Sequence, residues 1–319
     1  MAQTGSPAVL QYVEKPVPIP GPGEVVIEAD AIGVNYIDTY FRSGLYPRPL
    51  PFIVGQEVCG TVATVGADVA AIKAGDRVVT ASASGAYSQF CLAPADFVAY
   101  VPDSVPSDVI ASALLKGMTA HYLINSVYQV SAADWLLVHA GAGGVGLILT
   151  QWATSLGARV ITTVSTEDKA ELSRRAGAVE VLDYPDDPGV FAARIREITG
   201  GQGLAAVYDG VGRSTFDASL ASLGVRGTLA LFGASSGSVP PVDPLRLMSA
   251  GSIVLTRPSL VDFIRTSDEF AWRAGELLDA IADGCVTVTV GGHYPLARAR
   301  DAHQDLEDRR TTGSIVLLP

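Results

Sequence analysis

The chain has few of the residues that bind metals or form disulfides. Its 319 residues include only three cysteines and four histidines. The cysteines, Cys59, Cys91 and Cys285, are far apart and no C-x-x-C pair occurs, which excludes a disulfide framework and a four-cysteine zinc site. No two histidines have the H-x-x-x-H spacing of a zinc-binding helix either. We therefore expect a cytoplasmic protein without a bound metal.

Charge and long apolar runs are also scarce. Charged residues make up 17% of the chain, below the roughly 25% of an average protein. The net charge of −11 disfavours a nucleic-acid partner, because phosphate backbones are bound by clustered Lys and Arg. The sequence has neither the apolar run of a membrane span nor the apolar core of a signal peptide. Its hydrophobic content of 48% predicts a folded protein with a sizeable core.

Strand and turn patterns fill the first hundred residues, whereas strands and helices alternate afterwards. The first part predicts strands at residues 24–33, 59–65 and 76–79, as in a barrel or sandwich. Ser107 is expected to cap a helix over residues 107–128. Six strands are then predicted at residues 135–140, 159–164, 179–183, 205–209, 227–232 and 252–255. Helices are expected between them, at residues 144–156, 167–176, 190–199, 213–223 and 244–250. This alternation indicates a doubly wound parallel sheet.

The alternation stops after Arg257. The remaining sequence predicts a helix over residues 267–282, a strand over 286–290, a helix over 297–309 and a strand over 314–317. These elements are too few for a domain of their own, so we expect them to complete the first one. The predicted fold class is α/β, with a β-rich domain over residues 1–118 and 257–319 and a dinucleotide-binding domain over residues 119–256.

A glycine motif lies where the first strand of the alternating region ends, in the segment WLLVHAGAGGVG (Trp135–Gly146). In a chain with 33 glycines the spacing G-x-G-x-x-G alone would mean little, but a strand precedes this one and a helix follows it. Glycines allow a tight turn and close backbone approach, and the helix N-terminus attracts a pyrophosphate. A glycine-rich turn without a ligand is the alternative. The residues expected to bind a cofactor here are Gly141, Gly143, Gly144, Val145 and Gly146.

The end of the second predicted strand indicates which nucleotide binds. NAD-binding folds place Asp or Glu about 20 residues after the glycines, but here Ser165 and Thr166 come before the first acid, Glu167. Ser165 can donate to a phosphate, and Lys169 adds a positive charge one helical turn later, so NADPH is favoured over NADH. Alternatively, Lys169 belongs to a solvated helix face. Tyr184, just past the third strand, is expected to pack beside the adenosine ribose-phosphate.

Several longer segments are distinctive. They include GVNYIDTYFRSGLYP (Gly33–Pro47), KGMTAHYL (Lys116–Leu123), TVSTEDKAEL (Thr163–Leu172), YDGVG (Tyr208–Gly212) and LEDRRTTGSIVLLP (Leu306–Pro319). In these segments, and along nearly its whole length, the chain resembles the zinc-independent quinone oxidoreductases of the medium-chain dehydrogenase/reductase superfamily, the zeta-crystallin-like group. The resemblance implies a GroES-like catalytic domain, a Rossmann domain, NADPH as cofactor and a homodimer formed through the Rossmann domains.

The resemblance also implies roles for individual residues. Asn35 lies where the family contacts the nicotinamide, and Tyr40 and Tyr46 lie where tyrosines line the quinone pocket. These three residues are the expected catalytic ones. The two tyrosines are included because a tyrosine hydroxyl can donate a hydrogen bond to a developing oxyanion; ordered water is the alternative donor. Tyr40, Tyr46 and Arg42 are the expected substrate contacts, although Arg42 could instead be a surface arginine. Further cofactor contacts are expected at Tyr122, Ser165, Lys169, Tyr184, Phe232, Gly233, Thr256, Arg257, Pro258 and Arg309.

The segment Gly55–Gly60, GQEVCG, distinguishes this chain from zinc-dependent relatives, which carry G-H-E-x-x-G. Gln56 replaces the histidine, so Glu57 is expected to make a buried hydrogen bond or ion pair rather than a metal bond. Cys59 is expected to be a small core residue. His139, directly before the glycine motif, is expected to be packed and hydrogen-bonded.

Three functions remain open. The favoured one is NADPH-dependent reduction of a quinone, by hydride or electron transfer from the nicotinamide. The second is reduction of the C=C bond of an enone or enoyl thioester, although a thioester of CoA would need a basic cluster that the sequence does not show. The third is an NADPH-binding structural protein with little turnover. The expected partners are a small quinone or enone and a second copy of the chain, because residues 252–255 are predicted to form a bare edge strand.

Overall fold

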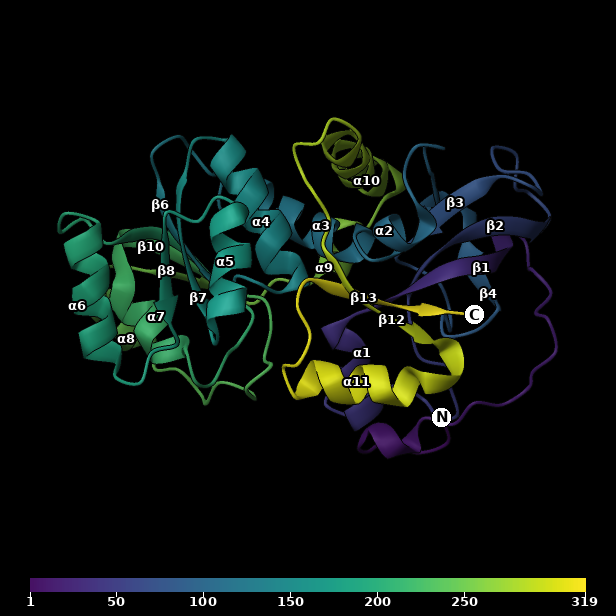
Figure 1. Ribbon diagram of the computed structural model, residues 1–319, viewed down its shortest axis with the longest axis horizontal. Coiled ribbons are helices and arrows are strands. Elements are labelled where there is room, and N and C mark those ends of the chain that lie inside the picture. The colour runs from purple at the N-terminus through teal and green to yellow at the C-terminus, as the bar shows by residue number, and fades with distance from the viewer. The chain divides into compact units, whose positions relative to one another are not determined.

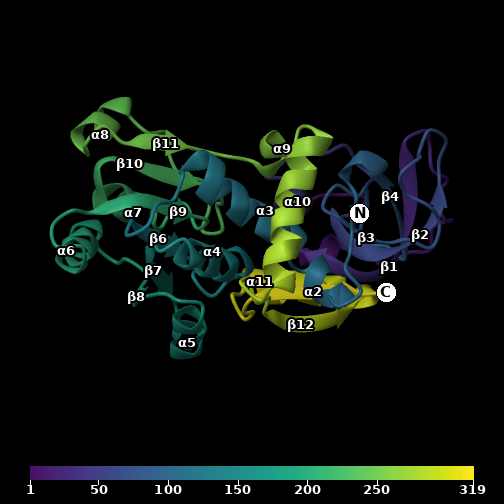
Figure 2. The ribbon, with the colours of Figure 1, turned by 90° about the horizontal axis from the view of Figure 1, so that it is seen from above.

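In the computed structural model, which describes residues 1–319, both ends of the chain belong to the same unit (Figures 1 and 2). Met1–Met118 and Ile264–Pro319 form this first unit, and Thr119–Phe263 form the second. The sequence predicts that the chain returns to the first unit at residue 257, slightly before the return at Ile264 in the structure. The last helices and strands of the chain therefore add to an existing core.

Strand β1 (Glu24–Val34) is the centre of the sheet in the first unit. It pairs antiparallel with β2 (Glu57–Val65), β4 (Phe90–Pro94) and the C-terminal β13 (Ser314–Leu318). The order is β12-β13-β1-β2-β3-β5, with β4 paired to β1; the other strands are β3 (Arg77–Thr80), β5 (Ala99–Tyr100) and β12 (Val290–Pro295). Alternate residues of β1, such as Val25 and Ile27, share one core with Ile315 and Leu317 of β13. This shared core holds the two chain ends together.

The helices that begin in the first unit are α1 (Tyr36–Ser43), α2 (Ser107–Ala111), α3 (Leu114–Tyr122), α10 (Ser267–Ala282) and α11 (Ala299–Glu307). Helix α10 begins and ends as predicted, since Thr266 and Glu269 form a capping box at its start. Helix α1 was not predicted from the sequence. It is short, and it begins directly where β1 ends.

Two predicted elements are wrong. The helix expected over residues 107–128 is broken after α2, and it ends in a π-helical turn over Leu123–Val127. Ser107 does not cap it, because the Ser107 hydroxyl bonds to Arg77 and Asp30 instead. The strand expected over residues 286–290 forms later, as β12. Parallel pairing with β13 decides its register, in spite of the better strand propensity of the preceding residues.

The second unit contains the predicted doubly wound sheet. Its strands are β6 (Trp135–His139), β7 (Arg159–Val164), β8 (Glu180–Asp183), β9 (Leu204–Asp209), β10 (Leu223–Leu231) and β11 (Val254–Thr256). All pairs are parallel, in the order β11-β10-β9-β6-β7-β8. The order reverses between β6 and β9. In such folds ligands bind beyond the carboxyl ends of the strands at this switch point.

The helices of the second unit are α4 (Gly144–Ser155), α5 (Glu167–Arg175), α6 (Pro188–Ile198), α7 (Phe216–Ser222), α8 (Pro244–Ser249) and α9 (Leu260–Phe263). Phe191 and Ile195 of α6 pack with Phe216 of α7 on Leu137 and Val207 of the sheet. The periodicity predicted five of these helices and missed the short α9. No helix in the structure is both long and apolar enough to cross a membrane.

Strand β11 is the edge strand that the sequence predicted, and apolar side chains are exposed on it. Val254 is 54% exposed, and Leu245 and Met248 of the preceding helix α8 are 62% and 63% exposed. Because bare apolar edges tend to find a partner, we expect a homodimer through this edge at micromolar concentration, measured by light scattering. Val254→Lys should give monomers, whereas Val190→Lys on the exposed face of α6 should not. A monomeric wild-type protein would contradict the expectation.

Candidate functional site

The glycine loop joins β6 to α4, and two of its glycines, Gly141 and Gly146, have no room for a side chain. A Cβ on Gly146 would lie 2.3 Å from the carbonyl oxygen of Ala140, and one on Gly141 would lie 2.5 Å from the Cβ of Thr162. Gly143 is the N-cap of α4 and no side chain caps the helix. The first N–H groups of α4, which include those of Val145 and Gly146, therefore have no intrahelical acceptor. This end of the helix fits a diphosphate.

The residues after β7 fit a phosphate better than a ribose hydroxyl. Ser165 is exposed directly beyond the strand, and Thr166 caps α5 by accepting from the backbone N–H of Lys169 at 3.3 Å. The nearest acid, Glu167, pairs with Arg174 at 2.6 Å. No carboxylate thus occupies the strand tip where an NAD site would place one. Tyr184 follows β8, and its ring lies 6.4 Å from that of His139, nearly parallel to it.

The remaining cofactor candidates of the second unit lie mainly at the ends of β10 and β11. Phe232 and Gly233 follow β10. On the neighbouring strand, Thr256 is the last residue of β11, and Arg257 and Pro258 follow it. The Arg257 guanidinium donates to the carbonyl oxygen of Leu231 at 2.7 Å, which ties the two strand ends together. They lie at the same sheet edge as the glycine loop, because every strand runs in the same direction.

Tyr122 is the exception, since it comes from the end of α3. It is buried, and its ring stacks on Phe263 of α9 at 4.5 Å with the planes 6° apart. The structure therefore places Tyr122 in an aromatic stack within the second unit.

In the first unit, Asn35 lies at the junction of β1 and α1 and touches a buried carboxylate. Its side-chain amide donates to Glu57 Oε2 at 2.7 Å, and the backbone N–H of Leu115 donates to Oε1 at 2.7 Å. The Lys116 ammonium lies 3.6 Å from Oε2. Burial raises the pKa of Glu57, and the charge of Lys116 opposes that shift. The expectation of a buried hydrogen bond or ion pair at Glu57 is confirmed, since both are present, and Cys59 is a fully buried core residue as expected.

Three tyrosines of one short segment form an aromatic cluster. The ring of Tyr40 lies 5.5 Å from that of Tyr36 and 5.1 Å from that of Tyr46. Tyr40 is buried, whereas Tyr36 and Tyr46 are half-buried. Tyr40 and Tyr46 were expected here from the sequence, whereas Tyr36 was not. The spacing of four residues, which places Tyr36 and Tyr40 on one face of α1, could have revealed it.

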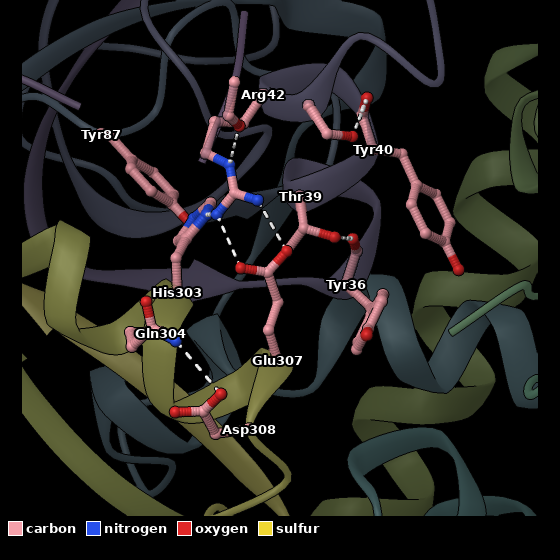
Figure 3. Close-up of polar contacts among 11 residues, drawn as sticks. Tyr36, Thr39, Tyr40, Arg42, Tyr87, His303, Gln304, Glu307 and Asp308 are labelled. Atoms are coloured by element: carbon pink, nitrogen blue, oxygen red, sulfur yellow. Dashed lines mark hydrogen bonds and ion pairs between the residues drawn. The ribbon is translucent and has the colours of Figure 1, made fainter. Parts of the chain in front are cut away.

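Arg42 does not have the role expected from the sequence. It is only 2% exposed, and its guanidinium donates to both carboxylate oxygens of Glu307 on α11, at 2.9 and 2.6 Å (Figure 3). Its Nε donates to the carbonyl oxygen of Gly5. With its donors thus engaged, Arg42 is a structural link between α1 and α11. Neither the substrate contact nor the alternative of a surface arginine is correct. The ring of Tyr40 points away from this ion pair (Figure 3).

At α1, three side chains from distant parts of the sequence share hydrogen bonds: Asp38 and His303 are buried and Tyr87 is half-buried. The Tyr87 hydroxyl lies 3.1 Å from Asp38 Oδ2 and 2.9 Å from His303 Nε2. Asp38 also accepts from the backbone N–H of Asn35. Burial raises the pKa of Asp38 to about 7, whereas burial and the charge of Arg42 lower the pKa of His303 to about 3. His303 is therefore neutral at pH 7, and Asp38 is close to its midpoint.

Arg309 follows α11 and is exposed, with a left-handed backbone conformation (φ 58°). Its charge acts on Tyr36, whose pKa is raised mainly by burial and then by Glu307, while Arg309 opposes the shift. Arg309, the last expected cofactor contact of the first unit, is thus close enough to the tyrosine cluster for its charge to act on Tyr36.

Comparisons with known proteins match the chain along its length. Residues 21–103 match the family described as Alcohol dehydrogenase GroES-like domain, and residues 144–283 match the family described as Zinc-binding dehydrogenase. Quinone oxidoreductase 1 of Escherichia coli (strain K12) is 46% identical over 99% of this chain and 97% of its own length. A 2-haloacrylate reductase of a Burkholderia species is 41% identical over 99% and 96%. A solved mycobacterial protein complexed with NADPH is 67% identical, with a TM-score of 0.99 over 100% of this chain and 98% of that one.

The raised pKa of Asp38 predicts a pH-dependent stability. The folded chain keeps Asp38 protonated up to about pH 7, whereas an unfolded Asp ionises near pH 4. The stability of the wild-type protein therefore decreases as the pH rises from about 4 to about 7. Asp38→Asn removes this titration. Its free energy of unfolding relative to wild type should therefore rise by about 1–3 kcal/mol between pH 5 and pH 8, measured by urea unfolding. The exposed control Asp279→Asn should show no such change, and a flat difference for Asp38→Asn would refute the assignment.

Proposed function

The chain belongs to the quinone oxidoreductases of the medium-chain dehydrogenase/reductase superfamily, and we propose that it reduces quinones with NADPH and without zinc. NADPH-dependent oxidoreduction rests on the full-length likeness to Escherichia coli quinone oxidoreductase 1 and to the mycobacterial protein solved with NADPH. The observation that carries the choice of a quinone is the cluster of Tyr36, Tyr40 and Tyr46. Its aromatic rings offer apolar surface to a flat, uncharged acceptor.

The residues of the second unit fit NADPH. The uncapped N-terminus of α4 and the glycines before it would hold the diphosphate. Ser165 and Lys169 would hold the 2′-phosphate, with Tyr184 beside the adenosine. In the first unit, Asn35 Oδ1 is buried without a hydrogen-bond partner, and the buried Lys116 ammonium has the 3.6 Å ion pair with Glu57 but no hydrogen bond. Such groups are rare in native structures unless a ligand or water satisfies them, which supports the placement of Asn35 beside the nicotinamide.

Zinc does not fit the residues of the first unit. The Glu57 carboxylate is occupied by two N–H donors and the ammonium of Lys116. Gln56 stands in place of the histidine of zinc-dependent relatives, and the structure has no group of three or more His, Cys, Asp or Glu side chains that could hold a metal. Burial also raises the pKa of the Cys59 thiol to about 11, whereas zinc binds the thiolate.

NADPH, when bound, supplies the reducing equivalents, and the protein orients and polarises the acceptor. As electron density reaches the acceptor oxygen, a hydroxyl donor stabilises the developing charge. Tyr46, half-buried beside Tyr40, is the proposed donor, and Tyr40 is the second candidate. Asn35 would orient the nicotinamide. Arg42 plays no part in this step, since Glu307 occupies it.

Reduction of a C=C bond is the second candidate function. A 2-haloacrylate reductase that is 41% identical along the full length supports it, because the same donors could polarise the carbonyl of an activated alkene. An NADPH-binding protein with little turnover is the third. The three differ in which acceptor, if any, oxidises NADPH.

Nicotinamide absorbance tests the function directly. Purified protein should oxidise NADPH with 1,4-benzoquinone or 9,10-phenanthrenequinone, and much more slowly with cyclohexenone or 2-chloroacrylate. Dialysis against a chelator should leave the rate unchanged. Faster oxidation with the alkenes would favour the second candidate, and NADPH binding without oxidation would favour the third. A rate that is lost to the chelator and restored by zinc would overturn zinc independence.

Lys169 should discriminate between the two nucleotides. Removing a charged group that pairs with a phosphate costs a factor of about 10 to 100, so Lys169→Met should raise the KM for NADPH by that factor and leave the KM for NADH nearly unchanged. The exposed Lys73→Met is the charge-matched control and should alter neither. Equal losses with both nucleotides would count against a 2′-phosphate contact.

Tyr46 should act through its hydroxyl. Tyr46→Phe keeps the ring that packs on Tyr40 but removes the donor, so kcat for quinone reduction should fall about 10- to 100-fold while the Kd for NADPH stays within about twofold. Tyr12→Phe, at a tyrosine that is 61% exposed, is the matched control. An unchanged kcat would assign proton donation to Tyr40 or to water.

A further inference from the structure

A chain of buried polar side chains crosses the second unit behind the cofactor candidates. His139 ends β6, Thr163 lies on β7, Asp209 ends β9 and Ser219 lies on α7. Each of the four is at most 1% exposed. Buried polar groups cost stability unless they are all satisfied, and none of these four is among the expected contacts of NADPH or of the quinone. Their arrangement therefore needs a separate explanation.

The distances allow one assignment of the protons. The Ser219 hydroxyl donates to Asp209 Oδ2 at 2.8 Å, so its oxygen must accept from His139 Nε2, 2.9 Å away. His139 Nδ1 then carries no proton and accepts from the Thr163 hydroxyl at 2.8 Å. The hydrogen bonds run in one direction, from Thr163 through His139 and Ser219 to Asp209. Because burial lowers the pKa of His139 in spite of the charge of Asp209, the ring is neutral at pH 7, as this order requires.

The Asp209 carboxylate, at the end of this series of hydrogen bonds, holds the loop that follows β9. Asp209 Oδ1 accepts from the backbone N–H groups of Val211 and Gly212, at 2.8 and 2.9 Å. The carbonyl oxygen of Asp209 accepts from the N–H of Phe232, just past β10. Asp209 therefore joins the ends of β9 and β10.

The other end of this series of hydrogen bonds, at His139 and Thr163, lies beside the glycine loop and the proposed 2′-phosphate site. His139 is followed at once by the turn that leads to Gly141, whose N–H donates to the carbonyl oxygen of Thr163. Thr163 itself is two residues before Ser165. The step from His139 to Ser219 and Asp209 crosses from β6 to β9, the switch point of the sheet.

We propose that His139 is a positioning residue for NADPH: with Thr163, Ser219 and Asp209 it forms a hydrogen-bonded clamp that sets the spacing between the glycine loop, the Ser165–Lys169 segment and the loops after β9 and β10. The inference rests on the proposed cofactor sites. None of its four residues is an expected contact of the nucleotide or the quinone, so the clamp should act on cofactor affinity and on the preference for the 2′-phosphate and leave the chemical step unchanged.

Fluorescence titration of the full-length protein with NADPH and with NADH tests the clamp. His139→Leu removes both hydrogen bonds, and its Kd for NADPH should rise about tenfold or more, with a smaller rise for NADH because that ligand does not need the Ser165–Lys169 segment. His139→Gln can still donate and accept, so it should stay within about threefold of wild type. At saturating NADPH, kcat should change less than about threefold in both variants.

A second variant separates the loss of hydrogen bonds from any effect of packing a different side chain at position 139. Ser219→Ala breaks only the link between His139 and Asp209, and it should shift the NADPH to NADH preference in the same direction as His139→Leu. His293→Leu, at an exposed histidine of the first unit, is the matched control and should alter neither Kd. Thermal unfolding of each variant checks that it is folded.

The clamp is overturned if His139→Leu and Ser219→Ala bind NADPH as wild type does and differ only in thermal stability. It is also overturned if both nucleotides lose affinity equally, or if kcat falls while Kd is unchanged. Because the readout is binding, it is independent of the acceptor. A protein that binds NADPH through the clamp but reduces no quinone would refute the proposed quinone reduction and leave the clamp intact.

Discussion

A buried carboxylate has to be paired, and each unit of this protein is arranged around one that is. In the first unit Glu57 is fully buried, accepts from Asn35 and lies beside Lys116. Gly33 makes room for it, since a Cβ there would lie 2.2 Å from Glu57 Oε2. In the second unit Asp209 is fully buried and is satisfied by backbone N–H groups and hydroxyls. In the first unit one of these partners, Asn35, is an expected cofactor contact. In the second unit the donors come from the loop after β9 and from α7, so pairing the charge fixes that loop at the end of the sheet.

The same requirement explains how an acidic protein can bind an anionic cofactor. The net charge is −11, yet the acid nearest to the proposed 2′-phosphate site, Glu167, is paired with Arg174. The attraction for phosphate comes instead from the backbone dipoles at the start of α4 and from Lys169. These sources are local, and the charge of the whole chain, spread over the surface and screened by salt beyond about 10 Å, does not cancel them.

Helix α1 shows how closely structure and proposed chemistry are connected in the first unit. Its eight residues present Tyr36 and Tyr40 on one face and Arg42 on another, as the helical period requires. Arg42 fixes the helix to α11 through a buried bidentate ion pair with Glu307, and a guanidinium held in this way has little freedom to rotate. The tyrosine cluster is therefore held by the last helix of the chain, which gives the C-terminal segment a structural role in the first unit.

The sequence by itself determined the parallel sheet, its six strands and the glycine loop, because helical periods and the absence of a Cβ act within a few residues of one another. It also indicated that Glu57 makes a buried hydrogen bond or ion pair rather than a metal bond. Only the tertiary structure decided that Arg42 binds Glu307, that the Tyr87 hydroxyl bridges Asp38 and His303, and that β12 forms later than its propensity suggests. The bonds of Arg42 to Glu307 and of Tyr87 to His303 join residues more than 200 positions apart, and no local pattern encodes which buried partner a polar group will meet. The register of β12 depends on its pairing with β13. The order of the hydrogen bonds through His139 likewise follows from distances across three strands, and the sequence indicated only that this histidine would be packed.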